Sequence, residues 1–589
     1  MATVRRLYLY FVAAIGLGLL LQGGATMLRL ILEAAGVPSG AISVYDIPSP
    51  TADKEALSLA VAFVVVGLPV WLIHWGFIEH LARRGDDAGA EERGSIIRSI
   101  FFLLVLAWLL YLAASGLFTG LREWLSETVG ASDPGYGYGY YAIVSVAANL
   151  STAILFGLAW AYHMRVRARD LRLGPPLVNG AARAFRLYLY GAALVGLALA
   201  VQSLTGLAGT VVDAVRGYVP APLPADGYSP FVLPKATAAW WAWPLLSGFL
   251  TLLVTVPIWL GHFLYSNRLL RVADFGSGEA TSRMRLGYFG AAVLIGVGTL
   301  VALCADAAAP LFAQPLNALD PNHTPAWRNL AVAVLVGLVP AALAVTHRRR
   351  AVSEAVGGDA SGPGPARVID YGIALIGIAA FSAGLVNGLA AIFQNVNHPG
   401  SRPAADIAEG FAQAAAGFVV WLWAWATISR RYFRNPFVEA GAPSRRFILL
   451  LIIGGSLVGG AFGLAACIER LTRIVVGVSG GATDSIPTAA ATVLVAAPLL
   501  IYHLIVLRLD ARVVPVAGEA AAELPTSEAP DLAAAVAVPV AAEPTVVVAA
   551  SQPGAPELVI VGPAGADLEG LRSVLGSWLP PGFTAEVRR

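Results

Sequence analysis

Twelve long apolar runs constrain the fold of this chain more than any other feature. A helix needs about 20 mostly apolar residues to cross the roughly 30 Å hydrocarbon core of a bilayer. The runs cover residues 7–32, 57–79, 99–120, 142–163, 187–212, 238–265, 286–305, 329–346, 371–394, 408–428, 447–468 and 488–509. Lipid offers no partner to free backbone groups, and the runs are too long for barrel strands. We therefore predict an all-α integral membrane protein with about twelve transmembrane helices.

The composition favours a lipid bilayer as the main partner. The chain is 57% hydrophobic and 13% charged, which is about half the charged fraction of a typical soluble domain. Its formal net charge of +2 gives no overall attraction to nucleic acid, so no nucleic-acid partner is expected. Cys304 and Cys467 lie near the ends of apolar runs without metal-like spacing. We expect them to be small apolar residues and not a disulfide.

Basic residues alternate between the connections that join the apolar runs. One set of connections, together with the start of the chain, carries 27 arginines and lysines, and the other set carries nine. Basic residues gather on the cytoplasmic side of membrane proteins, so both termini are predicted to be cytoplasmic. The connections with few basic residues would then close six helical hairpins on the opposite side.

A repeated five-residue sequence shows that the chain is built from related units. Arg6-Leu-Tyr8-Leu-Tyr10 returns as Arg186-Leu-Tyr188-Leu-Tyr190. An arginine opens each predicted hairpin, at Arg6, Arg98, Arg186, Arg285, Arg367 and Arg446. Arg6, Arg186 and Arg367 recur after 180 and 181 residues. This period predicts three parallel four-helix units, at residues 1–180, 181–365 and 366–512.

The second helix of each hairpin carries a pattern of its own. Its full form is Pro-x-Trp-x-x-His, and two copies of it are partial. The full copies are Pro69, Trp71 and His74, and Pro257, Trp259 and His262, and the partial copies are Trp160 with His163 and Pro498 with His503. The copies near Pro340 and Trp421 lack the histidine. Tryptophan and histidine three residues apart share one helix face.

These two patterns together resemble a family of bacterial multi-pass membrane domains of unknown function. The resemblance covers residues 1–512 as repeated units, although the last two hairpins keep the arginine and lose Tyr-Leu-Tyr. It implies a multi-pass protein of the bacterial cytoplasmic (inner) membrane. It implies no activity, so the motif residues have no assigned role.

The repeated histidines allow two interpretations. His74, His163, His262 and His503 could converge as a metal site or a proton relay. Alternatively, they form an interfacial belt, because each lies within a turn or two of the arginines. We favour the belt, and we predict no metal site, no cofactor and no catalytic residues.

The predicted helix centres contain almost no carboxylates. Glu79, Asp213, Asp306 and Asp370 all lie near helix ends. Intramembrane carboxylates usually mark ion-coupled transport, so their absence argues against a proton- or sodium-coupled transporter. The sequence also has no Walker loop, HExxH or GxSxG pattern, and we expect no enzyme activity. A double GxxxG at Gly455, Gly459 and Gly463, and another at Gly384 and Gly388, predict close helix packing.

The chain changes character after Arg512. Residues 513–556 are rich in Ala, Pro and Val and are predicted to be a flexible linker. Residues 557–589 suggest a small βαβ-like segment on the cytoplasmic side, with strands at 558–561 and 583–587 and a helix at 568–579. Such a short segment has too small a core to be stable alone. We expect this C-terminal tail to dock on a protein partner or to mediate self-association.

Three functions are compatible with these features. The favoured one is a non-catalytic scaffold, or an assembly or sensory component, of the membrane. A passive transporter or channel for a small solute or lipid is the alternative, and a cavity lined by Gln22, Asn149, Gln202 or Asn387 would favour it. A lipid-acting enzyme ranks last, because most of the repeated histidines have no carboxylate near them in sequence.

Overall fold

A computed structural model describes most of the membrane part and three short pieces of the C-terminal tail. The described residues are 2–38, 52–129, 146–173, 179–216, 241–271, 279, 282–314, 326–356, 364–397, 404–476, 486–513, 545–549, 557–561 and 584–588. The chain divides into two compact units, Met1–Val514 and Pro515–Arg589.

The described residues of the first unit include twelve long helices. They are α1 (Ala2–Ala34), α2 (Ala52–Ala82), α4 (Ile96–Val129), α5 (Val146–Leu173), α6 (Asn179–Arg216), α7 (Ala242–Leu269), α9 (Arg283–Ala313), α10 (Ala326–Val356), α11 (Gly364–Asn397), α12 (Ala404–Arg434), α14 (Pro443–Val476) and α15 (Ile486–Val513). Each predicted apolar run falls on one of them. Within the described residues, eleven helices are long and apolar enough to cross a membrane. The predicted span at 142–163 is the exception, because α5 carries Asn149, Ser151 and Thr152 in its first turns and several arginines in its last.

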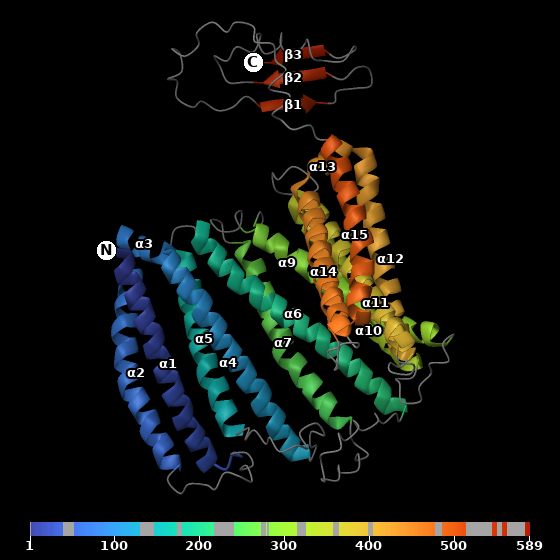
Figure 1. The fold of residues 1–589 in the computed structure, drawn as a ribbon. Coiled ribbons are helices and arrows are strands. Elements are labelled where there is room, and N and C mark those ends of the chain that lie inside the picture. The colour runs from blue at the N-terminus through green and yellow to red at the C-terminus, as the bar shows by residue number, and fades with distance from the viewer. Residues whose placement is uncertain are drawn as a thin grey trace, which may run out of the picture. The chain divides into compact units, whose positions relative to one another are not determined.

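The helices pack as six hairpins, and the packing repeats every four helices (Figure 1). We call the four-helix groups set one (α1, α2, α4, α5), set two (α6, α7, α9, α10) and set three (α11, α12, α14, α15). In each set the first helix also packs on the fourth, as α1 on α5, α6 on α10 and α11 on α15. Successive sets meet in one way, because α4 packs on α6 and α7, and α9 packs on α11 and α12. We call these two contacts the first and second junctions.

Aromatic side chains fill the interior near the arginine-rich ends of the helices, which we call the basic end. One buried cluster joins set one to set two and includes Trp75, Phe102 and Tyr188. A second joins set two to set three and includes Tyr288 and Ile369. Because the clusters cross the junctions, successive sets share a continuous core at this end.

Glycines bring α11 and α12 very close together. A Cβ on Gly417 would lie 2.3 Å from the backbone nitrogen of Phe381, and one on Gly384 would lie 2.4 Å from that of Ala414. The close packing predicted from the GxxxG at Gly384 is therefore confirmed. The double GxxxG of α14 differs, since a Cβ on Gly463 would lie 3.0 Å from the carbonyl oxygen of Ala489, whereas nothing lies within 4 Å of one on Gly455.

Among the described connections at the basic end, two contain a short helix. Helix α3 (Asp87–Gly94) begins after Asp86, whose carboxylate accepts a 3.1 Å hydrogen bond from the Gly89 backbone N–H. That hydrogen bond, with the neighbouring Arg84 guanidinium, holds the pKa of Asp86 below its ordinary value. Helix α13 (Pro436–Gly441) begins in the same way after Asn435, whose side chain accepts from the Val438 N–H. Both helices carry a glutamate that belongs to the site described below.

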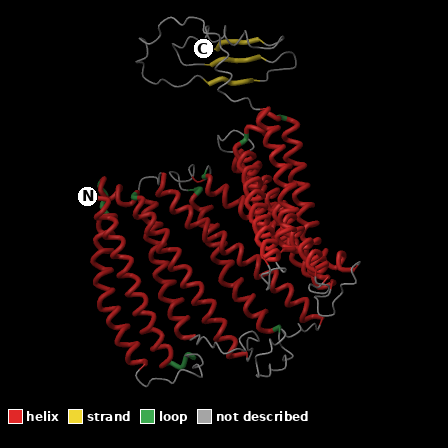
Figure 2. Tube along the Cα trace, in the orientation of Figure 1, coloured by secondary structure: helices red, strands yellow, loops and turns green. Residues whose placement is uncertain are grey.

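The C-terminal tail contains a three-stranded sheet in its described residues (Figure 2). Strand β1 (Thr545–Ala549) pairs antiparallel with β2 (Glu557–Val561), and β2 pairs parallel with β3 (Thr584–Arg588). The βαβ form predicted for this tail is not supported. Strand β1 adds an antiparallel partner and lies inside the predicted linker, and the predicted helix at 568–579 lies outside the described residues.

Candidate functional site: three charge clusters at the basic end

The first charge cluster joins α1, α3, α4 and α5. The Nε of Arg6 donates to Oε2 of Glu92 at 2.8 Å, and the Tyr10 hydroxyl donates to the other oxygen of Glu92 at 2.6 Å. Arg98 then donates to the Tyr10 hydroxyl at 3.0 Å and to Oδ2 of Asp170 at 2.7 Å. Arg98 is completely buried. These hydrogen-bonded charges tie α1, α3, α4 and α5 together, and Arg98 also donates to Glu79 of α2.

The second charge cluster repeats this arrangement in set two. Arg186 donates through Nε to Oε2 of Glu279 at 2.7 Å, and the Tyr190 hydroxyl donates to Oε1 of the same residue. Arg285, also fully buried, donates to the Tyr190 hydroxyl at 3.4 Å. Its Nε and Nη2 hold the two oxygens of Glu354 at 2.6 and 2.9 Å. The fork-to-fork pairing of a guanidinium with a carboxylate is the strongest form of such a contact.

The third charge cluster has the same five positions in set three. Arg367 pairs with Glu439 at 2.9 Å, and the Tyr371 hydroxyl donates to that carboxylate at 2.7 Å. Arg445 donates to the Tyr371 hydroxyl at 3.4 Å and grips both oxygens of Asp510. The sequence pattern assigned the opening arginine of this hairpin to Arg446. The structure corrects that assignment to Arg445, which is buried and lies six residues after Glu439.

Fixed spacings in the sequence generate all three clusters. The tyrosine follows the first arginine by four residues, one helical turn, so both side chains lie on one face. The glutamate precedes the second arginine by six residues in each copy. The last carboxylate follows a histidine of the fourth helix by seven residues, in the pairs His163 and Asp170, His347 and Glu354, and His503 and Asp510.

Sequence reasoning found the arginines of these clusters except Arg445, and it found Tyr10 and Tyr190, but it missed every carboxylate. The signal was present, because Glu92, Glu279 and Glu439 share one distance from a repeated arginine. It was hidden because these glutamates lie in the connections between hairpins, where charged residues usually face water. A buried charge is stable only when it is paired, so each arginine at the helix boundary predicts a nearby carboxylate.

The repeated histidines do not gather in one place. In each, Nδ1 lies 2.7–2.9 Å from the carbonyl oxygen four residues earlier on the same helix. His347 belongs to this group as well, although the sequence pattern missed it because it lies seven residues after Pro340 instead of five. His163 packs against the rings of Trp75, Phe101 and Phe102 in tilted or edge-on contacts. Each histidine therefore lies on a different helix, with aromatic neighbours of its own.

Tyrosine hydroxyls connect the histidine and tryptophan positions of neighbouring hairpins. Tyr188 accepts a 2.6 Å hydrogen bond from the indole N–H of Trp160 across the first junction, and its hydroxyl lies 2.9 Å from Nε2 of His262. Trp259 donates to Tyr288 at 2.9 Å. Tyr8 occupies the position of Tyr188 in set one and reaches His74 at only 3.4 Å.

The remaining motif residues lie within the helices. Trp71 packs edge-on against Tyr162, with ring centroids 6.1 Å apart. Pro69, Pro257 and Pro498 all lie inside helices, in α2, α7 and α15. The structure thus gives Trp71 a packing contact and places these prolines where each removes one backbone hydrogen bond.

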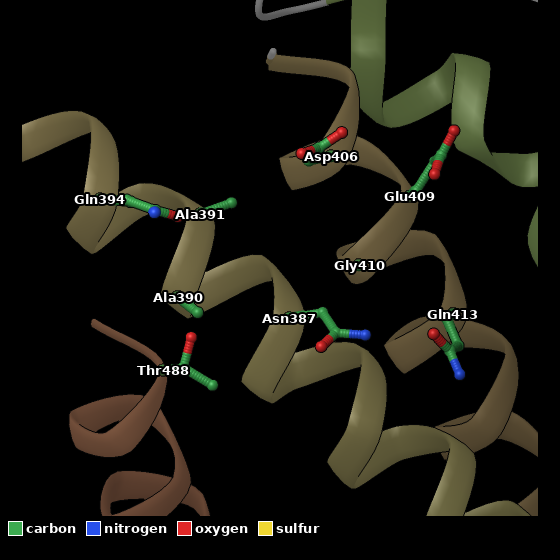
Figure 3. A pocket seen from close by; sticks show the side chains of 9 residues that line it. All are labelled: Asn387, Ala390, Ala391, Gln394, Asp406, Glu409, Gly410, Gln413 and Thr488. Atoms are coloured by element: carbon green, nitrogen blue, oxygen red, sulfur yellow. The ribbon is translucent and has the colours of Figure 1, made fainter. Parts of the chain in front are cut away.

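Two clefts open toward the other end of the helices, at equivalent places in sets one and three. The cleft of set one has a volume of about 390 Å³, and its lining includes Gln22, Arg29 and Thr152. The cleft of set three has a volume of about 270 Å³ (Figure 3). Its polar lining comes from α11, α12 and α15 and consists of Asn387, Gln394, Asp406, Glu409, Gln413 and Thr488. In set two, Arg328 pairs with Asp213 at 2.5 Å in the corresponding region.

Comparison with family models connects these clusters to a known domain. The model of a domain of unknown function, DUF5671, matches residues 6–135 and again residues 367–498. These two segments, which together make up less than half of the chain, are each similar to that domain. Both matches begin at the first arginine of a charge cluster, Arg6 and Arg367. Comparison with the curated proteins and with the solved structures gives no match.

The structure adds a third related unit between the two DUF5671 matches. Set two carries the complete five-residue charge cluster, from Arg186 to Glu354, and the same packing order of helices. The same charge cluster and the same packing order of helices are therefore repeated in all three sets.

Proposed function

We propose that this protein is a non-catalytic scaffold or assembly component of the bacterial inner membrane, with its basic end facing the cytoplasm. The bias of arginine and lysine toward one set of connections supports that orientation. The charge clusters support the scaffold role, because they fix the relative positions of many helices with charges that satisfy one another. The proposal assigns the C-terminal tail to docking on a protein partner.

The observation that carries this proposal is the filled space between the clefts and the charge clusters. On α1 the cleft begins at Gln22, twelve residues or about 18 Å from Tyr10. The intervening residues Ala13, Leu17 and Leu21 are buried. In set three, Ile373 and Ile378 are buried in the same way between Tyr371 and the cleft. Close apolar packing at these described residues supports a scaffold over a route for a polar solute.

The clefts themselves favour the alternative, a passive transporter or channel. Gln22 and Asn387 line them, and both are polar residues that lipid would not stabilise. In this alternative the helices would separate between the cleft and the basic end to pass a small solute or a lipid headgroup.

Flux through proteoliposomes distinguishes the two functions. The full chain is reconstituted, and leakage of a small entrapped dye and transfer of fluorescent lipid between leaflets are measured. The scaffold proposal expects both rates to equal those of protein-free liposomes. A rate at least ten times higher, reduced by Asn387→Leu but not by the control Leu338→Ala at an exposed residue of α10, would establish transport instead.

A further inference from the structure

We propose that copies of this protein associate head to tail in the membrane, with α14 of one copy packing on α1 and α2 of the next. The association would reproduce the junctions that already join successive sets within one chain. This inference goes beyond the proposed function, and its test does not depend on flux.

The two internal junctions define the surfaces involved. In both, the third helix of a set packs on the first two helices of the next set. Helix α14 is the third helix of set three, and its described contacts are mainly with α15, α11 and α13. Helices α1 and α2 correspond to the receiving pairs α6 and α7, and α11 and α12. The two surfaces of a junction are thus both present, and among the described helices none from another set packs on either of them.

Exposure of equivalent residues shows that the receiving surface is uncovered. The position two residues after the first arginine is Tyr188 in set two and Ile369 in set three, and each is only 3% exposed. Tyr8 holds this position in set one and is 57% exposed. The difference in exposure follows from the junctions. Helix α4 packs on the helix that carries Tyr188, and α9 packs on the helix that carries Ile369, whereas no described helix of another set packs over Tyr8.

The donating surface is uncovered at the matching place. Gly290, five residues after Arg285, lies against Ile369, since a Cβ on it would be 3.7 Å from Cγ1 of that side chain. In the first junction the equivalent residues, Leu103 and Tyr188, belong to one apolar cluster. The residue five after Arg445 is Leu450, which is 56% exposed. Leu450 is therefore the natural counterpart of Tyr8 in a neighbouring copy.

A second pair of positions shows complementary shapes. Leu294 contacts Gly372 in the second junction, where a Cβ on the glycine would lie 3.0 Å from Cδ2 of the leucine. The equivalent positions are Gly454 on α14 and Phe11 on α1. Nothing lies within 4 Å of a Cβ on Gly454, and Phe11 is exposed. In the second junction the large residue lies on the third helix of a set and the glycine lies on the first helix of the next. Between copies the glycine would lie on α14 and the large residue on α1, so Phe11 of one copy would fit against Gly454 of the next.

The depth of these residues in the membrane also agrees. Tyr8 and Phe11 lie near the basic end of α1, and Leu450 and Gly454 lie near the basic end of α14. Copies inserted in the same orientation place these residues at one level of the bilayer. Small residues allow such close lateral contacts between membrane helices, and a head-to-tail interface joins more than two copies.

Cysteine cross-linking in native membranes tests the association. In a background with Cys304→Ala and Cys467→Ala, a tagged Tyr8→Cys chain is co-expressed with a differently tagged Leu450→Cys chain and then oxidised. The expected product carries both tags and is at least ten times more abundant than a dimer of either chain alone. A Leu187→Cys chain is the matched control, because Leu187 lies at a similar depth and is also exposed.

Two outcomes would overturn the proposal. One is a yield for Tyr8→Cys with Leu450→Cys no higher than that for Leu187→Cys with Leu450→Cys. The other is equal cross-linking in Gly454→Trp and Gly455→Trp variants of the Leu450→Cys chain. Both glycines have open space around them, so neither variant should disturb folding. Only the tryptophan at Gly454 should reduce the cross-link, by about tenfold. Flux through proteoliposomes should be the same with and without Gly454→Trp. The cross-linking result and the flux result therefore test the association and the scaffold proposal separately.

Discussion

Arg98 and Asp170 form a buried ion pair between α4 and α5, with 2.7 Å between Nε and Oδ2. Glu79 of α2 holds a second nitrogen of the same guanidinium at 2.6 Å. One arginine therefore connects two hairpins. Arg285 and Arg445 pair in the same way with a carboxylate on the fourth helix of their own sets. This ion pair between the third and fourth helices is therefore present in all three sets.

Removing the charge of Asp170 should destabilise the helical unit strongly. Asp170→Asn leaves the buried Arg98 with Glu79 as its one full countercharge, and breaking a buried pair costs about 3–5 kcal/mol. We expect a loss of about 3 kcal/mol in the free energy of unfolding, measured by titration with SDS. Glu469→Gln is the control, because its pair with Arg473 is exposed and should contribute under about 1 kcal/mol. Equal losses would show that the buried pair has no special role.

Substitution of the two tyrosines of the first motif, Tyr8 and Tyr10, should have very different effects on stability. Tyr10→Phe removes the hydroxyl that links Glu92 to Arg98 and leaves buried polar atoms without a partner, at a cost of about 1–3 kcal/mol. Tyr8→Phe removes only an exposed 3.4 Å contact with His74 and should change stability by less than about 0.5 kcal/mol. Melting temperatures in detergent compare the two, and a larger effect at Tyr8 would contradict the cluster as described.

Sequence reasoning recovered the helices better than it recovered the site. The apolar runs located all twelve long helices, because a bilayer leaves a long apolar segment few alternatives to a helix. The site was only half predicted. Tyr8 and Tyr10 look equivalent in the sequence, yet one is exposed and the other is buried in a cluster. That difference depends on which helix packs beside each face, and a single helix pattern cannot supply it. The sequence also placed four histidines in one class without showing that His347 shares their backbone contact.

Glycine-to-alanine substitutions should change stability in opposite directions at two positions. Gly417→Ala places a methyl group 2.3 Å from the Phe381 nitrogen, so α11 and α12 must separate, at a cost of about 1–3 kcal/mol. Gly337→Ala meets nothing within 4 Å and should stabilise α10 by about 0.5–1 kcal/mol through helix propensity. Paired melting curves measure both changes. Stabilisation by Gly417→Ala would disprove the close approach.

Thiol labelling should report the orientation of the helices. In a cysteine-free background, Arg84→Cys lies at the basic end and Asp53→Cys lies at the opposite end of α2. A membrane-impermeant maleimide should label Asp53→Cys in spheroplasts and should label Arg84→Cys only after the membrane is permeabilised. The reverse pattern would place the basic end outside the cytoplasm.

The sequence separation within each charge cluster has a consequence for synthesis. The second arginine precedes its carboxylate on the fourth helix by 72, 69 and 65 residues in the three sets. At about 5–20 residues per second, the ribosome needs roughly 3–14 s to deliver that carboxylate. During this delay the guanidinium lacks that carboxylate, although Arg98 can already pair with Glu79 of the preceding hairpin, and we expect the side chain to stay at the water boundary. We therefore expect the same side chain to anchor a nascent hairpin first and to fix the set once its fourth helix has been made.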